Sequence, residues 1–165
     1  MTRMDDQDGL KLTIAIVRMC VGIIFLLFGW YKVAGPAFAH GGIQHYVQGF
    51  LDRNMVVSFY RPFLEKVALP HALFFGYGVG VGELLIGLSL VSGILVRIAA
   101  TGGAFYMVNF LLSEWNGPGA NAPTWQYFGA QLDHLGLLFL FLIFFADNAS
   151  RLSLQRLLTR SPKSA

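Results

Sequence analysis

Glu83 is the residue of this chain whose type and position most clearly predict chemistry. It lies in a glycine-rich apolar segment, residues 74–91, which reads FFGYGVGVGELLIGLSLV and contains no other charged residue. A helix of this length can cross a bilayer, and an ionisable side chain at such a depth usually faces a partner, a cavity or a pathway. Glu83 is therefore the centre of the predicted site.

Other polar side chains lie in the remaining apolar segments or at their ends. Counted at about 1.5 Å per helical residue, several of them fall at depths from which they could converge on Glu83. We predict that Glu83, Asp133 and His134 handle protons or a quinone, and that Arg18, Lys32 and Asn109 bind its head group. Arg18 would approach Glu83 from the inner half of the membrane, and the others from the outer half.

A structural interpretation of these charges stays open beside the functional one. Arg18 or Lys32 could simply neutralise Glu83, since buried charges are normally paired, and Asp133 could hydrogen-bond His134 or the loop above it. In the functional interpretation, Glu83 and His134 exchange protons as a bound quinone changes its redox state. Histidine changes charge near neutral pH, and desolvation can bring a carboxyl group toward the same range.

The sequence disfavours haem and predicts no metal site. Haem ligation by two histidines needs two imidazoles that face each other at one depth, and only His134 lies within an apolar segment. The single cysteine, Cys20, excludes an internal disulfide and a multi-cysteine metal site.

The composition predicts a membrane protein rather than a nucleic-acid-binding or soluble one. The chain is 55% hydrophobic and only 13% charged, whereas soluble domains carry about a quarter charged residues. It contains no dense Lys/Arg run that would favour nucleic acid. We predict one all-α domain over residues 1–165, an integral membrane four-helix bundle in the lipid bilayer, with spans at about 13–33, 72–91, 95–112 and 128–146.

The segments between the spans are predicted to lie at the membrane surface. The first outer loop, about 35–70, contains an amphipathic pattern from Ile43 to Leu51 and a second stretch at about 56–69, broken or restarted at Pro62, so we expect short interfacial helices there. Residues 147–165 are predicted to be a basic cytoplasmic tail, in which residues 151–163 have the pattern of a short amphipathic segment that lies against anionic headgroups. The distribution of Lys and Arg predicts that both termini are cytoplasmic, in a bacterial inner membrane.

Several of these motifs resemble those of the DoxX family. Arg18 and the run Gly29-Trp30-Tyr31-Lys32 are similar to its first-helix pattern. The segment 82–90 with the following Gly93-Ile-Leu-Val-Arg97 resembles its second-helix signature and turn. Asp133-His134 matches an acidic–histidine pair at the start of the last helix in many members, whereas residues 147–154 lack the glycines usual in the closing segment. The resemblance covers most of residues 14–158.

The resemblance implies a quinone-linked redox function. Members are four-helix membrane proteins, and some are DoxD-type subunits of thiosulfate:quinone oxidoreductase. No flavin motif or cysteine array is visible here, so the resemblance also implies a partner redox subunit or the quinone itself as the electron carrier. A homo-oligomer is an alternative assembly. A non-enzymatic role in membrane assembly, anchoring or small-solute permeation is the alternative hypothesis.

Overall fold

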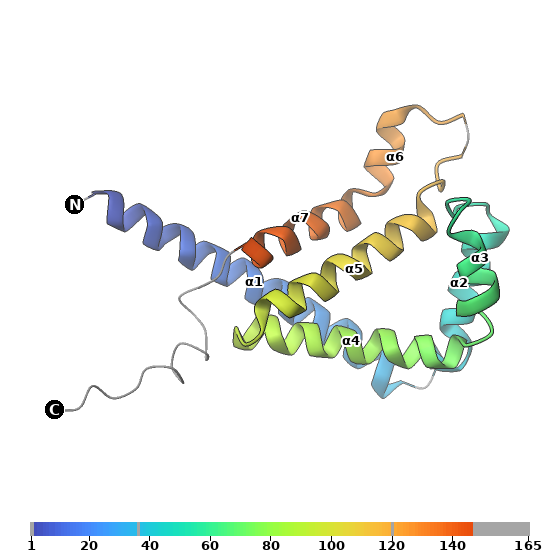
Figure 1. The fold of residues 1–165 in the computed structure, drawn as a ribbon, viewed down its shortest axis with the longest axis horizontal. Coiled ribbons are helices and arrows are strands. Elements are labelled where there is room, and N and C mark those ends of the chain that lie inside the picture. The colour runs from blue at the N-terminus through green and yellow to red at the C-terminus, as the bar shows by residue number, and fades with distance from the viewer. Residues whose placement is uncertain (1, 36, 120, 147–165) are drawn as a thin grey trace.

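The computed structural model describes residues 2–35, 37–119 and 121–146, and this part of the chain is helical without a strand. Short helical segments lie between some of the long helices (Figure 1). In chain order the elements are α1 (Thr2–Ala34), η1 (Phe38–Gly42), α2 (Ile43–Asp52), α3 (Arg61–Phe63), η2 (Leu64–Ala68), α4 (Ala72–Ser92), α5 (Val96–Glu114), α6 (Thr124–Ala130) and α7 (Leu132–Ala146).

Three helices of the described chain are long and apolar enough to cross a membrane. They are α1, α4 and α5, and α6 with α7 passes the same test as a pair that bends by 65°. Counting that bent pair as one span gives four. The predicted all-α membrane bundle is therefore confirmed, and so are the short helices of the loop between α1 and α4.

The helices differ from the predicted spans in two places. α1 already begins at Thr2, because an apolar run marks where a helix meets lipid and not where its hydrogen bonding starts. The last predicted span, 128–146, is not one straight helix, since α6 ends at Ala130 and α7 begins at Leu132. The predicted basic tail, 147–165, lies outside the described residues.

Glycines set the closest approach between α1 and α4, as the sequence predicts for small residues in membrane helices. A Cβ added at Gly29 would lie 2.8 Å from the carbonyl oxygen of Gly80, and one added at Gly22 would lie 3.0 Å from that of Gly87. Any side chain at these positions would push the helices apart. The contacts also fix an antiparallel register in which Gly22 lies level with Gly87 and Gly29 lies level with Gly80.

α5 packs mainly against α7, and the two helix pairs meet in one hydrophobic core. Gly103 accepts the ring of Phe141, which in turn contacts Phe25 of α1 edge-on with 5.3 Å between ring centroids. We call the end of the bundle with the α4–α5 turn the turn end. There Gly93 has the left-handed φ of 74° that the turn requires.

The opposite end of the bundle carries the short helices, and we call it the loop end. α2 and α3 lie across the ends of α4 and α5 that are far from the turn between these two helices (Figure 1). Leu51, Val56, Leu64 and Ala68 form a second small core under this loop. Pro62 lies in the first turn of α3, so it starts that helix rather than breaking one.

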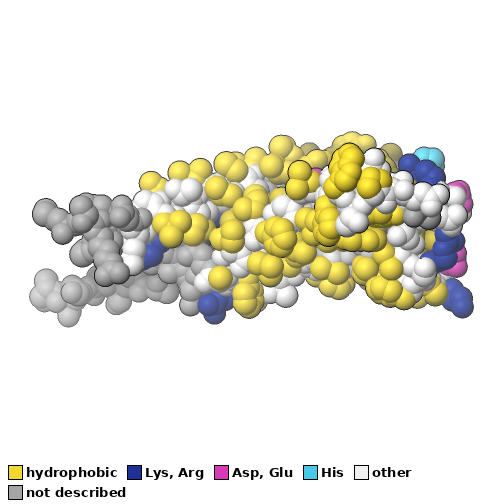
Figure 2. All heavy atoms as spheres, turned by 90° about the horizontal axis from the view of Figure 1, so that it is seen from above, with side chains coloured by type: hydrophobic (Ala, Val, Ile, Leu, Met, Phe, Trp, Pro, Cys, Tyr) yellow, Lys and Arg dark blue, Asp and Glu magenta, His cyan; other side chains and the backbone are white. Residues whose placement is uncertain are grey.

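The surface has the banded pattern of a protein surrounded by lipid. In the face that Figure 2 shows, hydrophobic side chains cover most of the middle of the described molecule. Charged side chains gather at the loop end, and some Lys or Arg side chains lie toward the other end. Large apolar residues such as Phe105, Leu85 and Phe139 are more than half exposed on the long helices. Exposed apolar area of this extent is expected where the solvent is hydrocarbon.

Candidate functional site

The buried carboxylate of Glu83 is paired with the ammonium group of Lys32. Lys32 Nζ donates a hydrogen bond to Glu83 Oε1, and the side chains are only 13% and 6% exposed. The ammonium group also lies 5.2 Å from the ring centroid of Phe38 in η1 and 5.8 Å from that of Phe28. The pair therefore joins α1 to α4 inside the membrane-spanning region, and aromatic rings cover its cation.

The second carboxylate oxygen of Glu83 has no protein partner in the described structure. Glu83 Oε2 is buried and receives no hydrogen bond. Buried polar atoms normally have a hydrogen-bond partner, and burial without one costs more for a charged carboxylate oxygen than for a neutral atom. One residue earlier, the absence of a side chain at Gly82 makes room for the hydroxyl group of Tyr106, which donates to the carbonyl oxygens of Gly78 at 3.1 Å and Val79 at 3.3 Å.

The predicted approach of Arg18 to Glu83 is wrong. Arg18 is 2% exposed, but the register of α1 against α4 places it one turn beyond Gly22, toward the turn end. Gly22 lies level with Gly87 and Leu90, so Arg18 is about two turns or more, over 10 Å, away from Glu83 along the helices. Of the two cations that the sequence offers to Glu83, the fold uses Lys32.

His134 and Asp133 lie in a second cluster near the loop end, with different partners. The imidazole stacks on Phe110 of α5, with 5.3 Å between ring centroids and 26° between the planes. Its Nε2 atom lies 3.8 Å from Glu114 Oε1, and its Nδ1 atom lies 3.3 Å from Asp133 Oδ1. The same Asp133 oxygen accepts a hydrogen bond from the backbone amide of His134, whereas most of the Asp133 side chain is exposed.

Gln131 anchors this second cluster at the break between α6 and α7. It is 1% exposed although its neighbours Ala130 and Leu132 are exposed, and its Nε2 group donates to the carbonyl oxygen of Glu114 at 2.9 Å. Neither Glu114 nor Gln131 is among the residues that the sequence predicts for the site. Glu114 ends an apolar run and resembles a solvent-facing helix end, and only the packing of α5 on α7 reveals its position beside His134.

Asn109 belongs to a third arrangement, which holds the loop to α5. Its side-chain oxygen accepts a hydrogen bond from the Tyr60 hydroxyl group, and its Nδ2 group donates to the carbonyl oxygen of Phe105 at 2.7 Å. Burial raises the pKa of the Tyr60 hydroxyl above its ordinary value of 10.0. Two further loop bonds, Val57 N to Leu112 O and Asn116 N to Met55 O, strengthen the attachment.

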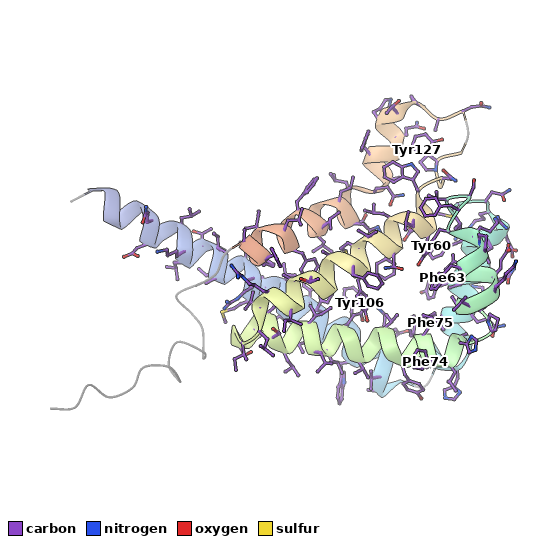
Figure 3. The ribbon with its side chains drawn as sticks, viewed as in Figure 1. Tyr60, Phe63, Phe74, Phe75, Tyr106 and Tyr127 are labelled. Carbon is purple, nitrogen blue, oxygen red and sulfur yellow. The ribbon has the colours of Figure 1, made fainter. Side chains whose placement is uncertain are left out.

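Aromatic side chains lie between the loop and the two central helices. Tyr60 and Phe63 come from the loop, Phe75 comes from α4 and Tyr106 comes from α5 (Figure 3). Ring centroids are 5.2 Å apart for Tyr60 and Phe63, and 6.0 Å apart for Phe63 and Phe75. These side chains are aromatic, and their polar groups are the hydroxyls of Tyr60 and Tyr106. The Tyr106 hydroxyl lies against Gly82, the residue before Glu83.

These contacts correct the prediction that all the polar groups converge on one site. Phe110 and Glu114, which contact His134, lie one and two turns beyond Tyr106 on α5, about 6 Å and 12 Å further along the axis toward the loop end. Tyr106 is level with Gly78 and Gly82. Glu83 and His134 are therefore held by separate partners at different depths. No three His, Cys, Asp or Glu side chains in the described ranges are placed to hold a metal ion.

Fold and site together define a multi-pass membrane protein with buried ionic groups in its spans. The family model of DoxX matches residues 13–113, which is more than half of the chain, and the chain belongs to the DoxX family. The match covers Lys32 and Glu83 and ends before Asp133 and His134. No curated protein and no solved structure matches the chain.

Proposed function

We propose that this protein is the membrane subunit of a quinone-linked oxidoreductase and that the Glu83–Lys32 pair receives the head group of the quinone. The observation that supports this proposal most directly is the buried Glu83 Oε2 atom, which lacks a hydrogen-bond donor among the described residues. A hydroxyl group of a bound quinol would supply that donor. The neighbouring aromatic side of the bundle is suited to a flat, apolar ring.

The chemistry assigns a separate task to each polar group. Quinone takes up two electrons and two protons to become quinol, and the electrons come from a reduced-sulfur donor such as thiosulfate, oxidised on a partner subunit. Lys32 Nζ would donate a hydrogen bond to a quinone oxygen, because an ammonium group has three hydrogens and Glu83 Oε1 uses one. Glu83 Oε2 accepts a hydrogen bond from a quinol hydroxyl group but repels a quinone carbonyl oxygen. The site therefore favours the reduced form.

The other predicted residues act at a distance from the head group in this proposal. Asp133 and His134 handle protons at the loop end, and Asn109 holds the loop over the aromatic side. With both termini cytoplasmic, the loop end faces outward from a bacterial inner membrane, and the quinone binds in the outer half of the bilayer. The partner redox subunit is expected to join the bundle in the membrane.

An activity measurement on the isolated complex tests this function. The complex is purified in mild detergent and assayed for thiosulfate-dependent reduction of a short-chain quinone, with wild type, Glu83→Gln and Glu65→Gln compared. Glu65 is an exposed carboxylate paired with Arg61 on the loop, and its substitution is the matched control. We expect Glu83→Gln to lose at least about tenfold in rate, the equivalent of one charge-assisted hydrogen bond, and Glu65→Gln to keep the wild-type rate. Equal rates in all three proteins would contradict the proposal.

A non-enzymatic role in assembly or anchoring is supported by one specific observation. Lys32 already neutralises Glu83 across the tight glycine contact between α1 and α4, so the pair can hold two helices in register without any ligand. In that case, protein extracted gently from its native membrane carries no quinone, and Glu83→Ala lowers thermal stability only. A stoichiometric quinone in the extract would refute the alternative.

A further inference from the structure

The cluster at the α6–α7 break contains one imidazole between two carboxylates, and the proposed quinone site does not use these contacts. From His134, Nε2 lies 3.8 Å from Glu114 on α5 and Nδ1 lies 3.3 Å from Asp133 on α7. The Nδ1 atom is buried and makes no hydrogen bond, and 3.8 Å is too long for one at Nε2. The ring thus has an acceptor close to each nitrogen without being bonded to either.

The charges around His134 are unbalanced when its ring is neutral. With both carboxyl groups ionised, Glu114 and Asp133 contribute −2, and Arg53 at the end of α2, whose charge acts on Glu114, contributes +1, which leaves −1. α6 has no charged residue. A proton on His134 brings the sum to 0 and gives the ring a donor for each carboxylate. Histidine is the side chain that ordinarily makes this change between pH 5 and 8.

The cluster lies where the chain bends. α6 and α7 meet at 65° around Gln131, whose side chain is tied to the end of α5. His134 is in the first turn of α7 and stacks on Phe110 of α5, so its contacts help to attach the start of α7 to the end of α5. α6 has no buried residue. Besides this cluster, it is held by the edge-on contact of Phe128 with Trp115 and by the hydrogen bond from the Tyr127 hydroxyl to the carbonyl oxygen of Gly119.

We propose that His134 is a proton-operated latch for the α6–α7 bend, a role independent of quinone binding. When protonated, the ring bridges Glu114 and Asp133 and fastens the start of α7 to the end of α5. When neutral, it leaves two carboxylates close together with one arginine nearby, and α6 with the first turn of α7 opens more often. The latch makes the attachment of this segment respond to the pH of the solution at the loop end.

Hydrogen exchange of the full chain in lipid nanodiscs tests the latch. Exchange is measured at pH 5.5 and pH 8 and corrected for the intrinsic pH dependence of amide exchange, for wild type, His134→Gln, Glu114→Gln and His45→Gln. His45 is an exposed histidine of the loop and is the matched control. In wild type and His45→Gln we expect amides 124–135 to be about fivefold better protected at pH 5.5, the effect of two partly exposed ion pairs.

Two variants of the cluster test whether the charge of His134 causes the pH response. His134→Gln and Glu114→Gln should both lose the pH response in residues 124–135, and Glu114→Gln keeps the Phe110–His134 stack, so a packing defect is distinguished from a lost charge. A pH response that persists in either variant would overturn the latch. So would equal protection of wild type at the two pH values.

Discussion

Replacement of Lys32 by methionine is the perturbation whose energetic effect follows most directly from the structure. Methionine keeps the length and apolar stem of lysine but removes the ammonium group that donates to Glu83 Oε1. The carboxylate, 6% exposed, is then left without a cation in a membrane-spanning helix. Breaking a buried ion pair by removal of one partner destabilises a protein by about 3 to 5 kcal/mol, and we expect Lys32→Met to fall in this range.

Substitution of the other partner, Glu83, should lower the free energy of unfolding by less, because the two partners differ in their access to water. In Glu83→Gln, the lysine side chain is near the end of α1 and can extend toward the loop end, as long basic side chains do near membrane surfaces. The free energy of unfolding then falls by about 1.5 to 3 kcal/mol, the contribution of one charge-assisted hydrogen bond. The double variant leaves no unpaired charge, so its destabilisation should be smaller than the sum of the single ones by at least about 2 kcal/mol.

The free energy of unfolding is measured in mixed micelles by titration with a denaturing detergent, followed by circular dichroism. Lys66→Met is the control, since Lys66 is an exposed lysine of the loop. It should stay within about 0.5 kcal/mol of wild type. A Lys32→Met variant as stable as Lys66→Met, or single effects that simply add in the double variant, would refute the placement of the Glu83–Lys32 pair.

Two further predictions concern close packing and ionisation. Gly82→Ala would place a Cβ 2.0 Å from the Tyr106 hydroxyl oxygen, so it should destabilise the protein by about 1 to 3 kcal/mol. Tyr106→Phe removes that oxygen and should relieve the destabilisation. Gly78→Ala, whose Cβ would meet no atom within 4 Å, is the control and should not destabilise the protein in the same unfolding titration. Because burial raises the pKa of the Tyr60 hydroxyl, the folded state keeps the hydroxyl proton at a pH at which the unfolded state has lost it. The contribution of Tyr60 to stability is therefore complete below about pH 10 and is lost as the pH rises further. Tyr60→Phe should flatten that alkaline loss of stability, and an unchanged alkaline slope would show that Tyr60 is solvent-exposed.

The charge in an apolar segment was sufficient to predict that Glu83 is buried and faces a partner. Its partner could not be selected in the same way. Depth counted from the ends of apolar runs placed Arg18 and Lys32 both within reach of Glu83. The fold chooses between them through the register of α1 against α4, which depends on where Gly22, Gly29, Gly80 and Gly87 make contact.

The break in the last span was not predictable from local signals, because the chain around it contains no proline. It depends on a tertiary contact, in which the buried Gln131 side chain donates to the end of α5. The same packing reveals Glu114 beside His134. In the sequence, Glu114 only marks the end of an apolar run, and the identity of its neighbour depends on how α5 lies against α7.

The most direct test of the proposed function is the binding of both redox forms of a short-chain quinone to the chain in lipid nanodiscs. Wild type should bind quinol more tightly than quinone, because Glu83 Oε2 accepts a hydroxyl hydrogen. In Glu83→Gln, whose amide can donate to a carbonyl oxygen, the ratio of the two dissociation constants should shift toward quinone by about tenfold or more. No binding to wild type, or the same ratio in Glu83→Gln, would contradict the proposal.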